Sequence, residues 1–414
     1  QPAYDFVTNP EGVTKYWEER VQSNGKFESI YTIGMRGIHD SAIQLPRGTN
    51  AVQALEDIFS VQRGLFAKYV NPDPAKVPQI FCPYKEVLAL FLSNLVVPPD
   101  VTVVFPDDNF GYVRYLPTPE QVAARPGGFG IYYHISYLGA PYSYVWLNTT
   151  PPALIWEEMS KAYDHGIRNL WILNVGDLKP GEVGIDFFMQ MAWNEKKWNL
   201  QTLPDYLKQW AALQFGSAHA DQIAALMEQY YHLGYQRKPE ELDWSLRGDP
   251  ERLSDFAKMD YGDKAANIPD ETRTRIVEYA KLGQVADAIG KTLPPDKQAA
   301  FFELVDYPID GSDYGNQRFF YNELTEYSMG QGIAVIANGA NATLAQPADE
   351  LTSLTDYYNN DLENGKWKLM TPDDLLQRDR SYRVPLLRPP TGLADFQPAV
   401  TPGIGVLIEG RDEQ

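Results

Sequence analysis

The sequence predicts an α/β protein, a (β/α)8 barrel of the TIM type, followed by an all-α helical bundle. Three observations predict this fold class. Short apolar runs alternate with helical patterns from residue 28 to about 195. Beyond residue 203 the apolar residues instead recur at spacings of three and four. Polar, titratable residues follow the predicted strands, as they do at the active-site face of a barrel.

The first half of the chain contains four predicted strands, at 28–35, 101–105, 130–138 and 169–175. Helical patterns follow them at 51–70, 83–95, 118–128, 152–166 and 183–193. Thr118 and Gln121 have the spacing of a capping box, which marks the start of one of these helices. Successive strand and helix units favour a parallel sheet.

The chain is predicted to contain three domains. Residues 1–200 form the barrel, and residues 201–380 form the helical bundle. Residues 381–414 are rich in proline and then become strand-like, which indicates a linker that enters a further domain.

Composition excludes several classes of partner and site. A net charge of −19 makes nucleic acid and anionic membrane surfaces poor partners, because both require clustered Lys and Arg. No apolar run is long enough to span a membrane. The lone Cys82 allows no internal disulfide, and we expect no metal and no cofactor because the usual ligand motifs are missing. Aromatic residues make up 13% of the chain, which fits a protein that stacks rings against sugars.

Polar side chains gather where the predicted strands end: Arg36, His39 and Asp40; Asp107, Asp108 and Asn109; His134; and Asn174, Asp177 and Lys179. Each has an ordinary structural explanation, since Asp and Asn cap turns and a histidine in an apolar run is often a core residue. Their repetition at one topological position favours a shared site. Such repetition favours a barrel, in which the loops after all strands build the active site. In a doubly wound sheet, only the strand ends beside the switch point line the binding crevice.

The residues at these strand ends favour glycoside hydrolysis. The motifs of P-loop enzymes, serine hydrolases and zinc proteases are absent. Paired carboxylates perform acid and base roles in glycosidases, and the candidates are Asp40, Asp107, Asp108 and Asp177. Because successive strand residues face opposite sides, we expect one of Asp107 and Asp108 to point inward and act in catalysis while the other fixes the loop. Arg36, Arg114 and Lys179 add cations that suit a substrate with its own carboxylate.

Several longer segments together resemble the xylan α-1,2-glucuronidases of glycoside hydrolase family 115: GMRGIHDS, PYKEVLALF, PDDNFGYVR, GIYYHISYLGAPYSYVWL, IWEEMSKAYDHGIRNLWILNVGDLKP and YYNNDLENGKWKLM. The resemblance stays in order from about residue 3 to 375. It implies release of α-1,2-linked glucuronic or 4-O-methylglucuronic acid from xylan with inversion. We expect the substrate to be contacted by Arg36, His39, Lys85, Asn109, Tyr112, His134, Trp146, Asn174 and Lys179.

The same resemblance implies that the chain begins inside the family's barrel, after an N-terminal domain and an early strand, so that the barrel at 1–200 lacks its first strand. It implies that residues 381–414 contain the linker and the start of a C-terminal β-sandwich. It also implies glucuronoxylan or its oligosaccharides as partner, a homodimer formed through a C-terminal domain, and a secreted or periplasmic location. Two alternatives stay open: a carbohydrate-binding fragment or pseudoenzyme without a complete acid and base, and a hydrolase of another acidic glycan.

Overall fold

The computed structural model describes residues 4–38, 41–43, 45–139, 143–176, 178–242 and 271–371. The chain divides into two compact units. The first contains residues 1–137, 152–176 and 184–199, and the second contains residues 138–151, 177–183 and 200–414. The predicted linker and β-sandwich at 381–414 lie outside the described residues.

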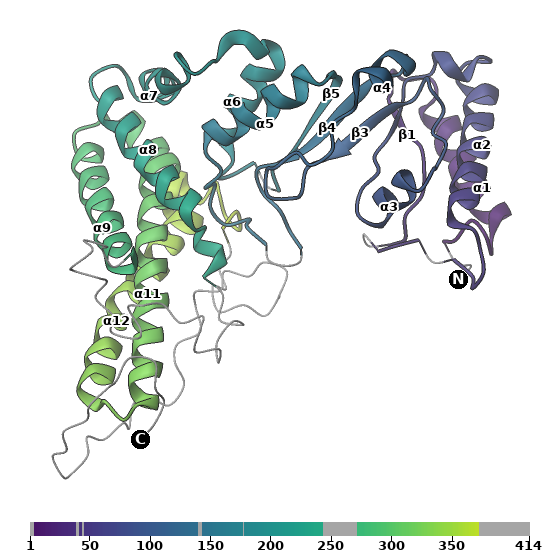
Figure 1. Cartoon of the computed structure of the whole chain (residues 1–414). Coiled ribbons are helices and arrows are strands. Elements are labelled where there is room, and N and C mark those ends of the chain that lie inside the picture. The colour runs from purple at the N-terminus through teal and green to yellow at the C-terminus, as the bar shows by residue number, and fades with distance from the viewer. Residues whose placement is uncertain are drawn as a thin grey trace. The chain divides into compact units, whose positions relative to one another are not determined.

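A five-stranded parallel sheet forms the centre of the first unit (Figure 1). Its strands are β1 (Tyr31–Thr32), β2 (Gln79–Phe81), β3 (Thr102–Pro106), β4 (Phe129–His134) and β5 (Ile167–Asn174). They lie in sequential order, and every neighbouring pair is parallel. The carboxyl ends of the strands therefore meet at one edge of the sheet, with His134 directly opposite Asn174.

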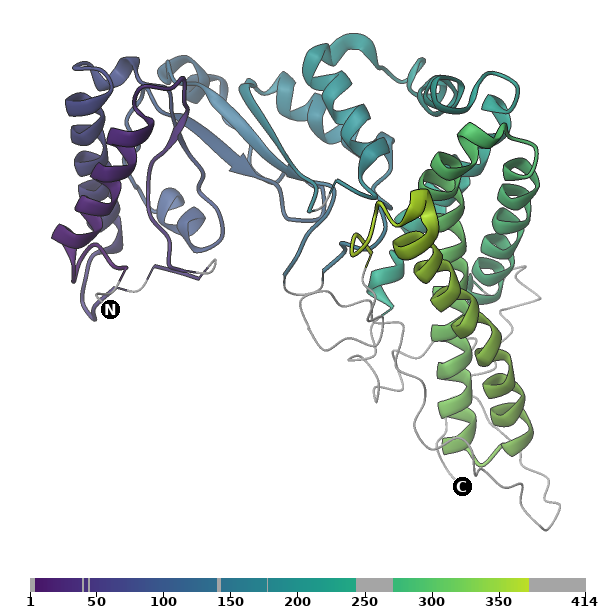
Figure 2. The same cartoon turned by 180° about the vertical axis from the view of Figure 1, so that it is seen from behind.

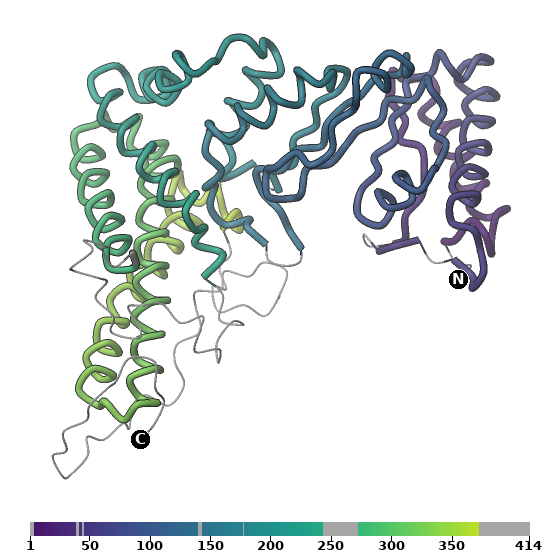
Figure 3. The backbone as a smooth tube through the Cα atoms, viewed as in Figure 1, coloured from purple at the N-terminus to yellow at the C-terminus, as the bar shows by residue number. Residues whose placement is uncertain are grey.

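Helices connect and flank these strands, as the path of the chain in Figure 3 shows. They are α1 (Pro10–Asn24), α2 (Ala51–Tyr69), α3 (Glu86–Leu92), α4 (Pro119–Ala124), α5 (Pro152–Asp164) and α6 (Glu182–Trp193). Asn50 caps α2, because its side chain accepts hydrogen bonds from the backbone of Val52 and Gln53. The capping box predicted from Thr118 and Gln121 is present at the start of α4.

The predicted parallel sheet is confirmed, but its details differ from the prediction. The strand expected at 28–35 is only two residues long. Strand β2 and helix α1 were not predicted: β2 has three residues, too few for a periodic pattern, and α1 has only two buried residues. The polar surface of α1 gives little apolar periodicity from which a helix can be recognised.

Long helices dominate the second unit. They are α7 (Tyr206–Phe215), α8 (Ala220–Gln236), α9 (Glu271–Gly290), α10 (Pro295–Phe301), α11 (Tyr307–Gly330) and α12 (Ala334–Asp356). Helices α11 and α12 run side by side over most of their length (Figure 2). Two π-helical turns, η8 (Phe302–Asp306) and η9 (Tyr357–Asp361), adjoin them. Short 3-10 turns occur at Pro74–Lys76, Glu195–Lys197, Leu203–Asp205, Pro239–Glu241 and Leu362–Asn364.

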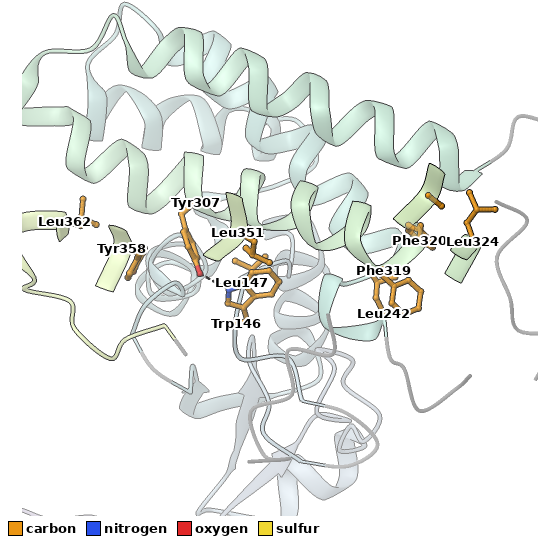
Figure 4. Packing of buried hydrophobic residues seen from close by; sticks show 11 residues of the cluster. Trp146, Leu147, Leu242, Tyr307, Phe319, Phe320, Leu324, Leu351, Tyr358 and Leu362 are labelled. Carbon is orange, nitrogen blue, oxygen red and sulfur yellow. Dashed lines mark hydrogen bonds between the residues drawn. The ribbon is translucent and has the colours of Figure 1, made fainter. Parts of the chain in front are cut away.

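The segment 138–151 follows β4 in the chain but packs within the second unit. Its Trp146 indole N–H donates to the Tyr307 hydroxyl at 3.0 Å (Figure 4). The backbone N–H of Leu147 donates to Oε1 of Glu240 at 2.9 Å. Glu240 is 1% exposed, so a fully buried carboxyl group holds this segment.

Each unit has its own buried core. In the first unit Val103, Val104 and Ile131 of the sheet have no exposed surface. In the second unit a cluster around Trp146 and Tyr307 includes Leu351 (Figure 4). Among the described residues, no helix combines the length and apolar character that a membrane span requires.

Candidate active site

Asp107 and His134 form a buried pair at the carboxyl ends of β3 and β4. Oδ1 of Asp107 lies 2.6 Å from Nδ1 of His134, and its Oδ2 accepts from the His134 backbone N–H at 2.9 Å. The backbone N–H groups of Asn109 and Gly111 also donate to this carboxylate, at 3.0 and 3.2 Å. Because every contact is with a donor, the carboxylate acts as acceptor and Nδ1 of His134 carries the hydrogen.

Tyrosine rings surround the imidazole of His134. The ring centroids of Tyr84, Tyr132 and Tyr137 lie 6.1, 4.5 and 5.7 Å from that of His134. Nε2 of His134 is buried and has no hydrogen-bond partner within the described part of the chain. A buried polar atom without a partner is uncommon and requires an explanation, and a ligand-binding role is one of them. His134 is 1% exposed, so its Nε2 is enclosed by the protein in this structure.

Two asparagines extend this group along the strand ends. The Tyr84 hydroxyl, after β2, donates to Oδ1 of Asn109 at 2.8 Å. The side-chain amide of Asn174, at the end of β5, donates to the Tyr132 hydroxyl at 2.5 Å. Four neighbouring strand ends, those of β2, β3, β4 and β5, therefore contribute polar groups to one connected site.

Asp108 points away from His134 and holds the following loop. Its Oδ1 accepts from the backbone N–H groups of Phe110 and Tyr112, and its Oδ2 forms an ion pair with Arg114 at 2.7 Å. Asp108 therefore occupies the loop-fixing position expected for one of the two aspartates. Gly111 has φ +87, and a Cβ there would lie 3.1 Å from the Tyr133 hydroxyl, so this turn requires glycine.

The role expected for Asp107 requires correction. Its side chain has no exposed surface and accepts four hydrogen bonds. A carboxylate with these contacts has no free lone pair for a ligand, and two of its four hydrogen bonds hold the backbone and the ring of His134.

Arg36 and Glu86 form a second charged pair at the strand ends. Nε and Nη2 of Arg36 donate to the two carboxylate oxygens of Glu86 at 3.0 and 2.8 Å, in a bidentate geometry. The side chains are 22% and 30% exposed, so both groups are accessible. The adjacent Lys85 is exposed, and its Nζ lies 5.3 Å from the centroid of the Tyr84 ring.

Backbone conformation distinguishes the ends of β2 and β3. Lys85 and Asn109 have φ of 53 and 72, values that residues other than glycine adopt rarely. Such conformations are costly and often occur in functional sites. Both residues were predicted from the sequence as substrate contacts.

Lys179 has neighbours other than those expected. Its Nζ forms hydrogen bonds with Glu182 and, at 2.8 Å, with Glu303. Burial alone would lower the pKa of Lys179, but these two carboxylates raise it above the usual value. Burial, followed by the charge of nearby Glu182, raises the pKa of Glu303 to about 7. An ammonium already held by two carboxylates is not available as the uronate-binding group that the sequence suggested.

Trp146 was expected to contact substrate, and this expectation also requires correction. The side chain is 3% exposed and lies in the core of the second unit, bonded to Tyr307. We therefore assign it to packing. Tyr112, by contrast, is half-buried on the loop after β3, with the Arg114 guanidinium 5.1 Å from its ring centroid.

His39, Asp40 and Asp177, three of the predicted site residues, lie outside the described residues. The part of the chain that the structure describes contains no group of three or more His, Cys, Asp or Glu side chains arranged to hold a metal ion.

Three residues of the site were not predicted from the sequence: Tyr84, Glu86 and Tyr132. Tyr84 and Glu86 follow β2, whose three residues were missed, so the loop at 82–85 was not recognised as a strand end. Tyr132 lies inside the predicted strand at 130–138, but only the histidine there was treated as a candidate. Tyr132 and His134 are two residues apart on one strand, so their side chains lie on the same face of the sheet. This spacing is visible in the sequence and could have identified Tyr132.

Comparison with known proteins identifies the family. Residues 1–241 match the profile of Glycosyl hydrolase family 115. A solved structure described as a novel family GH115 4-O-methyl-α-glucuronidase, BtGH115A, with specificity for decorated arabinogalactans, is 37% identical to this chain, with a TM-score of 0.76. The match covers 90% of this chain and 47% of that one, so the chain spans about half the length of this relative.

A second solved structure, a GH138 enzyme targeting pectin rhamnogalacturonan II, is 10% identical with a TM-score of 0.41, over 90% of this chain and 62% of that one. This likeness is too low to bear on fold or function. No curated protein sequence matches. The profile match covers more than half of the chain and agrees with the structural match at 37% identity. The chain belongs to glycoside hydrolase family 115.

Proposed function

We propose that this chain is part of an inverting glycosidase that releases α-1,2-linked glucuronic acid or 4-O-methylglucuronic acid from glucuronoxylan. The observation that carries the proposal is the Asp107 and His134 pair, with a buried Nε2 and tyrosines around it, at the strand ends of a family 115 chain. Rings and hydrogen-bonding groups at one point are what recognition of a sugar requires.

The five parallel strands in sequential order support a (β/α)8 barrel as the complete architecture. A doubly wound sheet reverses its strand order at a switch point, whereas a barrel continues around in sequence. The active site of a barrel is built at the carboxyl ends of its strands, which is where the polar groups of the first unit gather.

Glu86 is the described carboxylate best placed to contact substrate. Asp107 is completely buried and Asp108 is bound by Arg114 and two backbone N–H groups, whereas Glu86 is 30% exposed beside Arg36. Together with Asp40 and Asp177, it supplies the candidates for the acid and base pair. In an inverting enzyme the two carboxyl groups stand ~6.5–9.5 Å apart, with the attacking water between them.

Arabinogalactan bearing glucuronic acid is a second candidate substrate, because the solved relative is described as specific for decorated arabinogalactans. We propose a secreted or periplasmic location and, for a longer protein, a homodimer formed through the C-terminal domain. The reaction itself needs no cofactor in this proposal, since proton transfer and water suffice.

The test is an assay of uronic acid release from glucuronoxylan and from glucuronidated arabinogalactan, with the anomeric configuration of the first product followed by NMR. Release of the β-anomer from either glycan supports the proposal and identifies the substrate. Release of the α-anomer would contradict inversion. Binding without release, measured by calorimetry on the same glycans, would instead identify a carbohydrate-binding protein.

Glu86→Gln, with Glu56→Gln on the surface of α2 as a matched control, tests the assignment of the carboxylate. Loss of an acid or base typically costs 10²–10⁴ in rate, so Glu86→Gln should lower kcat by that factor while the control keeps it. An unchanged kcat for Glu86→Gln would remove Glu86 from the pair.

A further inference from the structure

Two carboxyl groups lie in the contact between α9 and the start of α11 (Figure 1). Asp306 ends the π-helical turn η8, and Asp310 follows one turn later on the same face. On α9 the residues opposite them are glycines. A Cβ at Gly283 would lie 2.7 Å from Oδ1 of Asp310, and a Cβ at Gly290 would lie 3.4 Å from Oδ2 of Asp306. Both carboxyl groups therefore lie directly against the second half of α9.

The charges around these two groups are negative. Among the described residues, those that act on them belong to other carboxylates: Asp287 on α9 acts on both, and Asp313 on α11 and Glu350 on α12 act on Asp310. Oδ1 of Asp306 is buried and has no hydrogen-bond partner within the described part of the chain. Ionised carboxylates that share a site repel one another, so this contact is favoured while Asp306 and Asp310 are neutral.

The other titratable groups near the contact do not offset this repulsion. Lys291 lies one turn beyond Asp287 on α9, and its Nζ is 2.5 Å from Oδ2 of Asp287, where both side chains are largely exposed. Tyr314 follows Asp310 by one turn, and burial followed by the charge of Asp310 raises the pKa of Tyr314 to about 12. Helix α10 and the turn Pro239–Glu241 pack on η8 and α11, respectively, and within the described residues they supply no charge that acts on either aspartate.

The surroundings of the two aspartates change their affinity for protons. Burial, followed by the charges of neighbouring carboxylates, raises the pKa of Asp306 and of Asp310 from 3.8 to about 7. Each group therefore binds its proton about 10³-fold more tightly in the folded chain than in an unfolded one. The resulting stabilisation is complete below pH 3.8 and is lost as the pH rises to about 7. Above that pH, two ionised groups face the second half of α9.

The first half of α9 is held by bonds that do not involve these aspartates. Nε of Arg275 donates to Oδ1 of Asn316 on α11 at 2.6 Å, and its Nη1 donates to the carbonyl oxygen of Leu233 on α8 at 2.6 Å. We therefore expect a loss of contact caused by ionisation to occur in residues 281–290 and not in residues 271–280.

From this geometry we propose that Asp306 and Asp310 form a pH-sensitive switch in the second unit. The second half of α9 packs against α11 while both carboxyl groups are neutral, and it separates from α11 locally when they are ionised. This switch lies wholly within the helical unit and operates whether or not the chain releases uronic acid.

The experiment measures hydrogen–deuterium exchange of the full chain from about pH 5.5 to about pH 8.5, with each rate divided by the intrinsic exchange rate at that pH. Peptides from residues 281–290 report on the switch, and peptides from residues 271–280 are the internal reference. Asp306→Asn, Asp310→Asn and the double variant keep the shape of the side chain but cannot ionise. Asp349→Asn, at an exposed position of α12, is the matched control.

In the wild-type chain we expect the protection of residues 281–290 to fall about 10- to 100-fold across this pH range, while residues 271–280 keep theirs. In the double variant the protection should stay constant and should exceed that of the wild type at about pH 8.5, because a neutral amide replaces each ionised group. Each single variant should remove part of the pH dependence, and Asp349→Asn should leave it unchanged.

Protection that does not change with pH in the wild type, or a double variant with the wild-type pH dependence, would overturn the proposal. An equal loss of protection in both halves of α9 would overturn it as well, since the whole unit and not this contact would then respond to pH. Should the double variant not fold, the single variants and a ¹³C NMR titration of the wild-type carboxyl groups decide. Apparent pKa values of about 7 for Asp306 and Asp310 support the switch, and values of about 4 refute it.

Discussion

Replacing Asp107 by Asn tests the buried pair at the centre of the candidate site. Each oxygen of the carboxylate accepts two hydrogen bonds: Oδ1 from Asn109 N–H and His134 Nδ1, and Oδ2 from Gly111 N–H and His134 N–H. An amide supplies only one oxygen, so its NH2 group must face two donors. The less costly orientation turns the NH2 group toward His134 Nδ1, because the imidazole can move its hydrogen to Nε2 and accept at Nδ1.

The loss of folding stability in Asp107→Asn can be estimated from the groups that lose a hydrogen-bond partner. The backbone N–H of Asn109 is left without an acceptor, which costs about 1–3 kcal/mol, and the lost charge-assisted bonds cost about 1.5–3 kcal/mol. The sum is about 2.5–6 kcal/mol. At ~2–4 °C per kcal/mol for a unit of this size, the Tm of the first unit should fall by ~5–24 °C.

Calorimetry measures this Tm, and ¹⁵N NMR of the imidazole nitrogens reports which nitrogen of His134 carries the hydrogen. Uronic acid release should fall by ~10²–10⁴ in kcat, because the hydrogen on Nε2 changes what His134 offers a ligand. Asp108→Asn is the matched control and should lose only ~0.5–2 kcal/mol, as a lost cap does. If Asp107→Asn keeps the hydrogen on Nδ1 and shifts the Tm no more than Asp108→Asn, the pair does not orient His134.

Three further changes test other parts of the structure. Arg36→Ala should raise KM for uronic acid release by one to two decades, because it removes the cation beside Glu86; an unchanged KM would exclude Arg36 from uronate binding. Trp146→Phe should lower stability by about 1–3 kcal/mol through the lost bond to Tyr307 and leave kcat unchanged, as denaturant unfolding and the release assay would show; a lower kcat at unchanged stability would return it to the site. Burial raises the pKa of Glu240 from 4.5 to about 7, so its contribution to stability is present below pH 4.5 and is lost as the pH rises to about 7. Glu240→Gln should therefore reduce the loss of stability between pH 4.5 and 7 by roughly 3 kcal/mol, measured by melts across this range, and an identical pH dependence would contradict the raised pKa.

The sheet could be predicted from the sequence because its central strands are buried on both faces. Val103 and Val104 are fully buried neighbours on β3, so the run VTVVF is continuously apolar and unlike a helix face. The short strands β1 and β2 carry too few residues to show any period. Their positions depend on pairing with their neighbours along the sheet, and pairing is not visible in a local pattern.

The sequence predicted which residues lie in the candidate site better than it predicted what each of them does. Asp107, Asn109, His134 and Asn174 do meet at the strand ends, because the ends of parallel strands share an edge. The pattern could not show that Asp107 is saturated by donors. Two of them come from a loop whose turn depends on the positive φ of Asn109, and the other two come from His134 on the neighbouring strand. In the same way, Glu303, one of the two carboxylate partners of Lys179, lies far along the chain and is brought to it only by tertiary packing.

The contrast between Asp107 and Glu86 decides where proton transfer is to be sought. The Asp107 carboxylate is enclosed by four donors, so it has no free lone pair with which to contact a ligand. Glu86 keeps accessible surface and a fixed orientation through Arg36, two properties that an acid or base in a glycosidase needs. Under the proposed inverting mechanism, we expect the spacing of ~6.5–9.5 Å between Glu86 and its partner, Asp40 or Asp177. In the same proposal Asp107 acts through the imidazole of His134 and Asp108 holds the loop, so neither of the two adjacent aspartates needs to contact the substrate.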